Sequence, residues 1–170
     1  MGKRRAARES ALRILYELEF NDEWVEPVLA REAAGGGAER DERAHAAWLV
    51  RGALARKAEI DALIESTSAH WRVARMAVVD RNILRLAVFE MMEDAVLAPA
   101  IVINEAIEIA RRFSGDAAAV FVNGVLDAVR KKLGGAQTET PGTKETKDHG
   151  RTQDTPERGT RPGARLRAKK

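Results

Sequence analysis

The chain has 170 residues, of which 45% are apolar, enough for the core of one domain or of two small subdomains. It contains no run of 18 apolar residues, no apolar signal peptide and no cysteine, which excludes a membrane span, a disulfide framework and a thiol nucleophile. Residues 1–135 contain 20 Lys and Arg against 21 Asp and Glu, whereas residues 136–170 contain nine against five. We therefore expect a cytoplasmic protein whose basic ends favour a polyanionic partner.

Helical spacing of apolar residues begins close to the N-terminus. Over residues 4–20, the apolar side chains recur at steps of three and four and predict a helix that buries Ala11, Ile14, Leu15 and Leu18. Asn21 and Asp22 are expected to end this helix. Pro27 is compatible with the first turn of a short helix that follows.

The first predicted helix also concentrates positive charge. Its first turns contain Lys3, Arg4, Arg5 and Arg8, and Tyr16 lies on the flank of Arg5. Cations at a helix start oppose the helix dipole, so helix stability does not explain them. Arginine binds phosphates and stacks on bases, which indicates a nucleic-acid surface. A solvated charged face is the alternative, and the residues alone leave both interpretations open.

The rest of the chain predicts further helices and a tail. Apolar spacing indicates helices over residues 41–64, 79–92, 99–113 and 117–133. The dense apolar pattern of residues 79–92 is typical of a helix buried on more than one side. Asp116 is expected as the N-cap of the last helix, with Gly134 and Gly135 as its stop. Residues 136–170 contain Leu166 as their only large aliphatic residue, so they are expected to form a disordered basic tail after a domain of residues 1–135.

No catalytic, metal or cofactor site is predicted. The histidines at 45, 70 and 149 lack partners at metal-ligand spacing, and the glycines at 35–37 lack the Lys-Ser/Thr that accompanies a phosphate loop. Glu105 and Glu108 lie about 60° apart on a helix. Surface ion pairing explains them better than acid–base catalysis, which requires a pocket and a shifted pKa. We therefore predict that the protein is not an enzyme and uses no cofactor.

Four sequence blocks resemble the NusB family of transcription antitermination factors. They cover residues 7–16, 79–90, 102–110 and 121–127, and occur in the family's order across residues 3–133. The resemblance implies an all-α, NusB-like fold of two packed helical bundles with about seven helices. It also implies binding of the single-stranded boxA element of ribosomal RNA transcripts together with the ribosomal protein NusE, in a complex that helps RNA polymerase resist termination. Some members form homodimers that hide the RNA surface.

The resemblance also implies roles for particular residues. The RNA-binding set is Lys3, Arg4, Arg5, Arg8 and Tyr16, with Asp116 and Phe121 near the RNA. Asp80 falls where the family helix faces NusE. Asn104, Glu105, Asn123 and Asp127 match positions that we interpret as structural, with an Asn–Glu hydrogen-bond network across the last two helices.

Two other functions remain open from the sequence. One is a homodimerising helical interaction module without RNA binding, whose arginines only solubilise it. The other is a detached accessory domain of an RNA methyltransferase, although this chain has no room for a cofactor-binding Rossmann domain.

Overall fold

The computed structural model describes residues 2–21, 24–35, 39–67 and 71–136. The chain divides into a unit of residues 1–139 and a unit of residues 140–170, and the second lies outside the described residues, as does almost all of the predicted tail. The elements are α1 (Lys3–Leu18), α2 (Val25–Ala34), α3 (Arg40–Ala55), α4 (Lys57–Glu65), the short 3-10 helix η1 (Val73–Arg75), α5 (Val78–Glu93), α6 (Pro99–Ser114) and α7 (Asp116–Ala136). The predicted all-α, NusB-like fold is confirmed, with seven α-helices and no strand among the described residues. None of these helices is long and apolar enough to cross a membrane.

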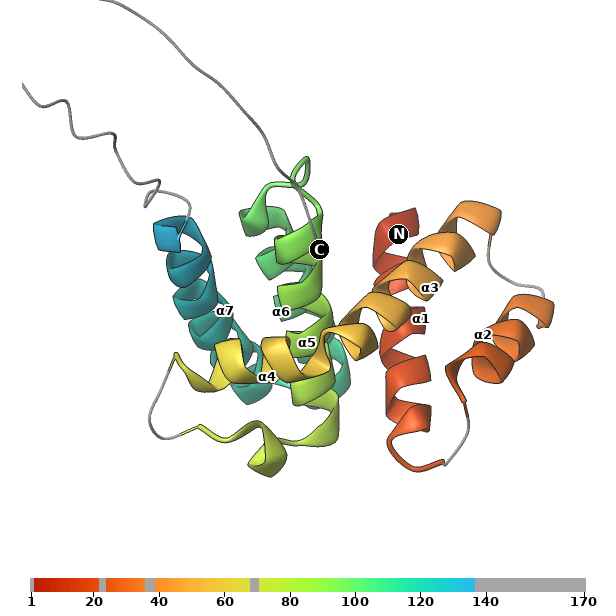
Figure 1. Ribbon diagram of the computed structural model, residues 1–170, viewed down its shortest axis with the longest axis horizontal. Coiled ribbons are helices and arrows are strands. Elements are labelled where there is room, and N and C mark those ends of the chain that lie inside the picture. Colours follow the sequence, from red (N-terminus) through yellow and green to blue (C-terminus); the bar gives the residue numbers. More distant parts are fainter. Residues whose placement is uncertain (1, 22–23, 36–38, 68–70, 137–170) are drawn as a thin grey trace, which may run out of the picture. The chain divides into compact units, whose positions relative to one another are not determined.

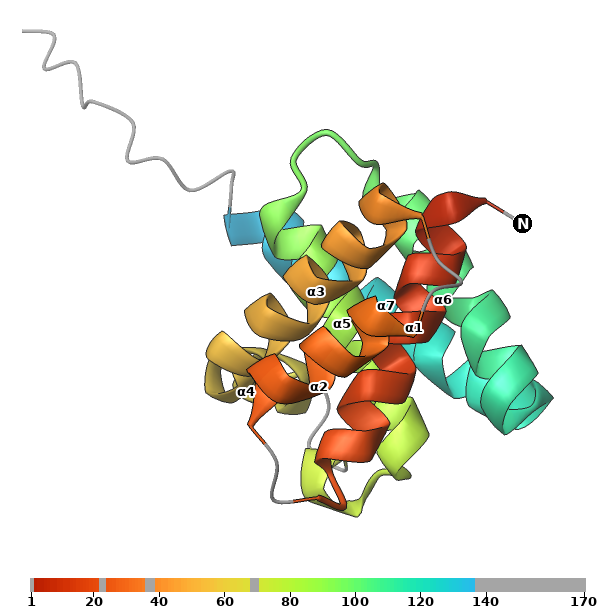
Figure 2. The same ribbon diagram turned by 90° about the vertical axis from the view of Figure 1, so that its right-hand side faces the viewer.

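Helix α5 lies at the centre of the helical unit. It packs against α1 and α3 on one side and against α6 and α7 on the other, so that two bundles share it (Figure 1). Figure 2 shows α1, α2 and α3 in front of α5, with α6 and α7 behind. Nine consecutive residues of α5, from Asn82 to Glu90, are buried. The prediction of a helix buried on more than one side is therefore confirmed.

Helix α1 buries the face that its spacing predicts. Ala11, Ile14 and Leu15 are buried, and Leu18 is partly buried against the same core. The helical backbone bonding continues to the amide of Asn21, which donates to the carbonyl of Glu17 at 3.1 Å. The helix itself ends at Leu18, two residues before the predicted end, and Asp22 lies outside the described residues.

The predicted single helix over residues 41–64 is wrong, because it breaks at Arg56. There φ is −106° and ψ is 17°, so α3 ends at Ala55 and α4 begins in a new direction at Lys57. After the break, α4 buries Ile60 and Ile64 in the core and packs against α5. Arg56 is neither Gly nor Pro, so its local sequence gave no sign of the break.

The last helix differs from its prediction at both ends. Asp116 is the first residue of α7 rather than its cap, because the preceding carbonyl of Gly115 accepts the amide of Ala119 at 3.1 Å. Gly115 has φ 94°, which joins α6 directly to α7. At the other end, α7 continues through Gly134 and Gly135 to Ala136, so the predicted glycine stop is also wrong.

Candidate nucleic-acid interface

The first two cations of α1 are exposed and weakly held. The side chains of Lys3 and Arg4 are 66% and 58% exposed. Lys3 Nζ lies 2.5 Å from Glu39 Oε2, and Arg4 Nη1 lies 3.4 Å from Asp94 Oδ2. Exposed pairs of this kind contribute little to stability, because solvent screens them. Both cations can therefore exchange their carboxylate partners for another anion.

Arg5 is held more firmly, by a carboxylate of α6. Its Nε and Nη2 each donate to Glu105 at 2.7 Å, and the guanidinium remains partly exposed. The hydrogen bond from Arg5 lowers the pKa of Glu105, and the same bond raises the pKa of Arg5. The pair is ionised and fixes the direction of the Arg5 side chain.

Arg8 lies below the surface, in an ion pair with α5. Its Nε and Nη2 each donate to Glu90 at 2.7 Å, and Arg8 is only 6% exposed. His45 Nε2 lies 3.5 Å from the same carboxylate. Burial raises the pKa of Glu90, but the contacts from His45 and Arg8 outweigh burial and lower it overall. The structure thus separates Arg8 from the exposed cations beside it.

Tyr16 begins a second exposed cluster further along α1. It is 45% exposed, and its ring centroid lies 4.9 Å from that of Phe20, which is 64% exposed. Between the cations and these rings, the buried carboxylate of Glu9 accepts bonds from Arg112 of α6 at 2.7 and 2.9 Å and pairs with Arg13 at 3.7 Å. Phe20 and Arg112 were not among the residues predicted to bind RNA.

Asp80 and Phe121 meet at one pocket of about 510 Å³. Asp80 Oδ1 is buried there and has no hydrogen-bond partner. The ring of Phe121 lies 4.7 Å from that of Trp71, which is half exposed. Sequence reasoning missed this wall of the pocket, which contains Trp71, Arg72 and Arg75. An exposed Trp next to Arg was the available signal.

Asp116 does not line this pocket. It is 90% exposed, and its Oδ1 accepts from Arg111 Nε at 3.1 Å. Ser114 and Ala117, which are close to Asp116 in the sequence, do line the pocket.

The residues interpreted as structural differ from expectation. The predicted Asn–Glu network between α6 and α7 is wrong: Glu105 bonds Arg5 of α1, and Asn104 and Asn123 are exposed with no hydrogen bond within the described residues. Glu108 pairs with Arg111 on its own helix, as the surface interpretation predicts. Asp127 pairs with Arg130 and Lys131 at 2.7 Å.

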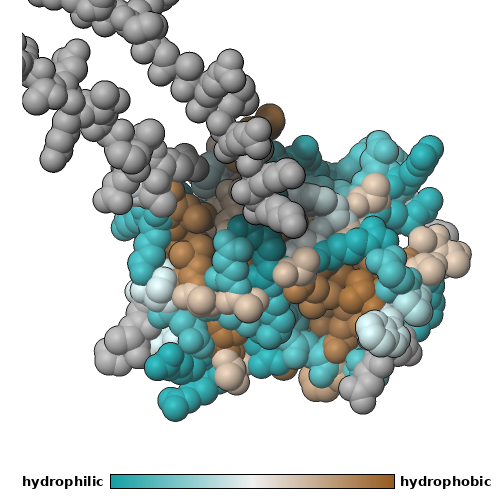
Figure 3. Space-filling view, in the orientation of Figure 1, coloured by the Kyte–Doolittle hydropathy of each residue, from teal (hydrophilic) through white to brown (hydrophobic). Residues whose placement is uncertain are grey.

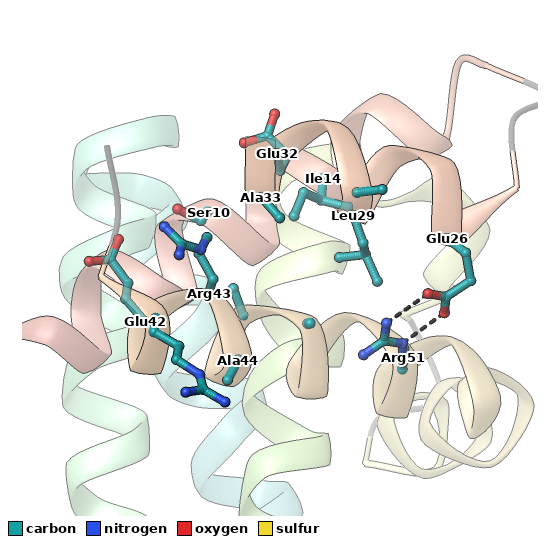
Figure 4. Close-up of a pocket in the computed structure, with 14 residues that line it drawn as sticks. Ser10, Ile14, Glu26, Leu29, Glu32, Ala33, Glu42, Arg43, Ala44 and Arg51 are labelled. Atoms are coloured by element: carbon teal, nitrogen blue, oxygen red, sulfur yellow. Dashed lines mark hydrogen bonds and ion pairs between the residues drawn. The ribbon is translucent and has the colours of Figure 1, made fainter. Parts of the chain in front are cut away.

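A separate groove of about 390 Å³ lies between α1, α2 and α3 (Figure 4). Ile14 and Leu29 point into it, and the region forms an apolar patch framed by hydrophilic residues (Figure 3). Its rim has three acidic and three basic residues: Glu26, Glu32, Glu42, Arg40, Arg43 and Arg51. These charges balance, and Ile14 lies about 160° from Tyr16 around α1. The groove is therefore on the other side of α1 and offers no net attraction for a polyanion.

Among the residues that the structure describes, no three His, Asp or Glu side chains lie close enough together to hold a metal ion. The arrangement is one of ion pairs, cations and aromatic rings, which can bind a charged polymer and hold helices together.

Known proteins resemble this chain over most of its length. The sequence model of the NusB family matches residues 5–131. The transcription antitermination protein NusB of Solibacter usitatus is 44% identical over 135 residues, covering 78% of this chain and 92% of that protein. NusB of T. maritima has a similar structure, with a TM-score of 0.69 and 34% identity, covering 76% of this chain and 91% of that one.

A further similar structure contains the antitermination factors NusB and NusE in complex with double-stranded RNA. The TM-score is 0.69 at 28% identity, and the match covers 76% of this chain and 97% of that chain. On the family match, the identity to known antitermination proteins and the shared helical architecture, the chain belongs to the NusB family.

Proposed function

We propose that this protein is an RNA-binding transcription antitermination factor. It recognises a boxA-like single-stranded element of nascent ribosomal RNA together with NusE, and it helps RNA polymerase resist termination in the cytoplasm. The family is non-enzymatic, so the protein acts by binding. The observation that supports the proposal most is the exposed cationic and aromatic edge of α1.

Three cations form the proposed phosphate-binding part of this edge. Lys3 and Arg4 exchange their carboxylate partners for phosphates, which costs little because both cations are exposed and ion pairs at the surface are weak. Arg5 is already oriented by Glu105 and keeps part of its guanidinium at the surface. Tyr16 adds a ring against which a base can stack.

Arg8 belongs to the proposed site as its support. Its bidentate bonds to Glu90 attach α1 to α5 directly beneath the exposed cations. A buried, fully bonded guanidinium is unavailable to a phosphate unless this ion pair breaks, and breaking a buried pair is strongly unfavourable. We therefore assign RNA contact to Lys3, Arg4 and Arg5, and assign to Arg8 the placement of α1.

The pocket at Asp80 is the proposed contact with NusE. A buried carboxylate oxygen without a hydrogen bond is unfavourable, and a partner that turns the Asp80 side chain toward a donor of its own would remove that penalty. Phe121 lines the same pocket, and Asp116 lies beside it in the chain. This arrangement supports the proposal that RNA and NusE meet around Phe121. The likeness to a chain in a complex of NusB, NusE and RNA supports the same partners.

Assembly in solution tests the proposal. We expect the purified full chain, NusE and a boxA-containing RNA to elute together from a size-exclusion column with light-scattering detection. Asp80→Ala should weaken NusE binding and leave RNA binding by the protein alone unchanged. Asp41→Ala, which removes the same charge from the exposed first turn of α3, is the matched control.

Two results would contradict this proposal. A homodimer that persists in excess RNA, with no RNA complex formed, would support the interaction module instead. Equal NusE affinity of Asp80→Ala and Asp41→Ala would remove the NusE contact from the pocket.

A further inference from the structure

The exposed ring of Tyr16 lies on the same stripe of α1 as Arg5 and Arg13. At 100° per residue, Arg5, Glu9, Arg13 and Tyr16 fall within a sector of about 80°. Beyond Leu18 the chain forms a turn in which the amide of Phe20 donates to the carbonyl of Glu17 at 3.1 Å, and this turn leaves the ring of Phe20 4.9 Å from that of Tyr16. At 1.5 Å per residue, the stripe from Arg5 to Tyr16 is about 16 Å long.

The middle of this stripe contains two exposed arginines beside one buried carboxylate. Two guanidinium groups, those of Arg13 and Arg112, share the single carboxylate of Glu9. Both side chains are at least half exposed, whereas Glu9 is buried. Arg112 also lies over the ring of Phe113, 5.5 Å from its centroid. A phosphate backbone bound at Arg5 would therefore pass Arg13 and Arg112 on this side of α1 before it reaches the rings.

The far end of the stripe approaches the pocket proposed for NusE. Glu19, next to Phe20, accepts from Arg81 Nη2 at 2.6 Å and Nε at 3.2 Å. Arg81 in turn follows Asp80, which lines that pocket. The rings of Tyr16 and Phe20 therefore lie between the cationic edge and the proposed partner site, where a bound strand would pass.

We infer that Tyr16 and Phe20 form a stacking platform for bases of the bound RNA, with Phe20 as an RNA-contacting residue. Two adjoining rings that are 45% and 64% exposed offer faces to bases, and stacking on aromatic side chains is tolerant of sequence. Arg13 and Arg112 lie close to these rings, and their positive charges favour a polyanion such as RNA over a protein surface that lacks acidic residues. This inference rests on the proposed RNA-binding function, and it adds base contacts to phosphate contacts.

Three substitutions of Phe20 separate stacking from other roles. Phe20→Ala and Phe20→Leu should each weaken binding of a boxA-containing single-stranded RNA by about five- to tenfold, the lower end of stacking contributions, and Phe20→Trp should restore it. Leucine keeps the apolar volume without an aromatic face, so it distinguishes base stacking from apolar protein docking. In both Phe20→Ala and Phe20→Leu, the slope of log affinity against log salt should equal that of the wild type, because neither substitution removes a cation. Circular dichroism checks that the folded state is unchanged.

A strand with abasic positions and a charge variant complete the experiment. On RNA that has the same phosphates but abasic sites, Phe20→Ala should bind like the wild type; an equal loss on both strands would overturn the platform. Wild-type affinity of Phe20→Ala or Phe20→Leu, with Lys3→Glu/Arg4→Glu weakened, would overturn the platform and leave the proposed function standing. If Lys3→Glu/Arg4→Glu and the Phe20 variants all bound the RNA with wild-type affinity, the stacking platform and the proposed RNA-binding function would both be overturned.

Discussion

The basic residues at the start of α1 have three different environments. Lys3 and Arg4 are exposed, Arg5 is half-buried against Glu105, and Arg8 is buried against Glu90. In the sequence they form one cluster, because nothing local distinguishes them. The distinction comes from carboxylates 100 and 82 residues away, which only the fold brings to Arg5 and Arg8.

At this scale, Arg8→Met tests the buried pair. It leaves Glu90, 1% exposed, without its bidentate partner, so we expect the free energy of unfolding to fall by about 3–5 kcal/mol in urea titrations at neutral pH. Lys3→Met, which breaks an exposed pair, is the control and should change stability little. A small loss in Arg8→Met would show that the pair does not hold α1 on α5.

The pH dependence of that loss has a definite sign. The folded-state pKa of Glu90 is lowered below its ordinary value of 4.5, so its contribution is present above that pH and is lost as pH falls through the lower folded value. Without Arg8, burial favours the protonated acid. The unfolded-state pKa is common to both proteins, so the stability difference between the wild type and Arg8→Met should shrink as pH falls from the higher pKa of Glu90 in the variant to its lowered pKa in the wild type; a constant difference would contradict an ionised pair.

The helices show which elements the sequence predicts well. Apolar periodicity located α1, α5 and α6 closely, because each has a clear buried face or proline start. It failed at Arg56, where the reason for the break is the packing of α4 on α5 rather than a local signal. Apolar periodicity also did not predict that α3 needs a glycine at position 52, where α5 packs against it.

The packing of α3 on α5 depends on that glycine. A Cβ at Gly52 would overlap the ring of Phe89, which is buried and packs against Trp48 with centroids 4.9 Å apart. We expect Gly52→Ala to lower the free energy of unfolding by about 1–3 kcal/mol, although alanine favours the helix itself.

Gly124→Ala in α7 is the matched control for this prediction. Nothing lies within 4 Å of a Cβ there, so the substitution should raise stability by about 0.5–1 kcal/mol. Thermal or urea unfolding measures both variants. Equal effects of the two substitutions would show that α3 and α5 are not in the close contact described.

At the scale of the whole molecule, the distribution of charge matters more than its sum. Residues 1–135 are almost neutral, yet exposed cations gather in the first turn of α1, while the charged residues that line the groove between α1, α2 and α3 balance. The sequence predicted the edge and the family, and thereby the fold and the partners to test. It did not predict Phe20, Arg112 or Trp71, because their positions beside the edge and the pocket depend on helix packing.

The salt dependence of RNA affinity tests the role of this edge most directly. Each phosphate contact contributes about −0.7 to the slope of log affinity against log salt for a single strand, so three cations of α1 contribute about −2. We predict that Lys3→Glu/Arg4→Glu weakens binding of boxA-containing RNA and makes the slope shallower by about 1.4 relative to the wild type. Arg130→Glu/Lys131→Glu, the same charge change on exposed residues of α7, should leave the slope unchanged. An unchanged slope in the α1 variant, or an equal change in the α7 variant, would contradict RNA binding by α1.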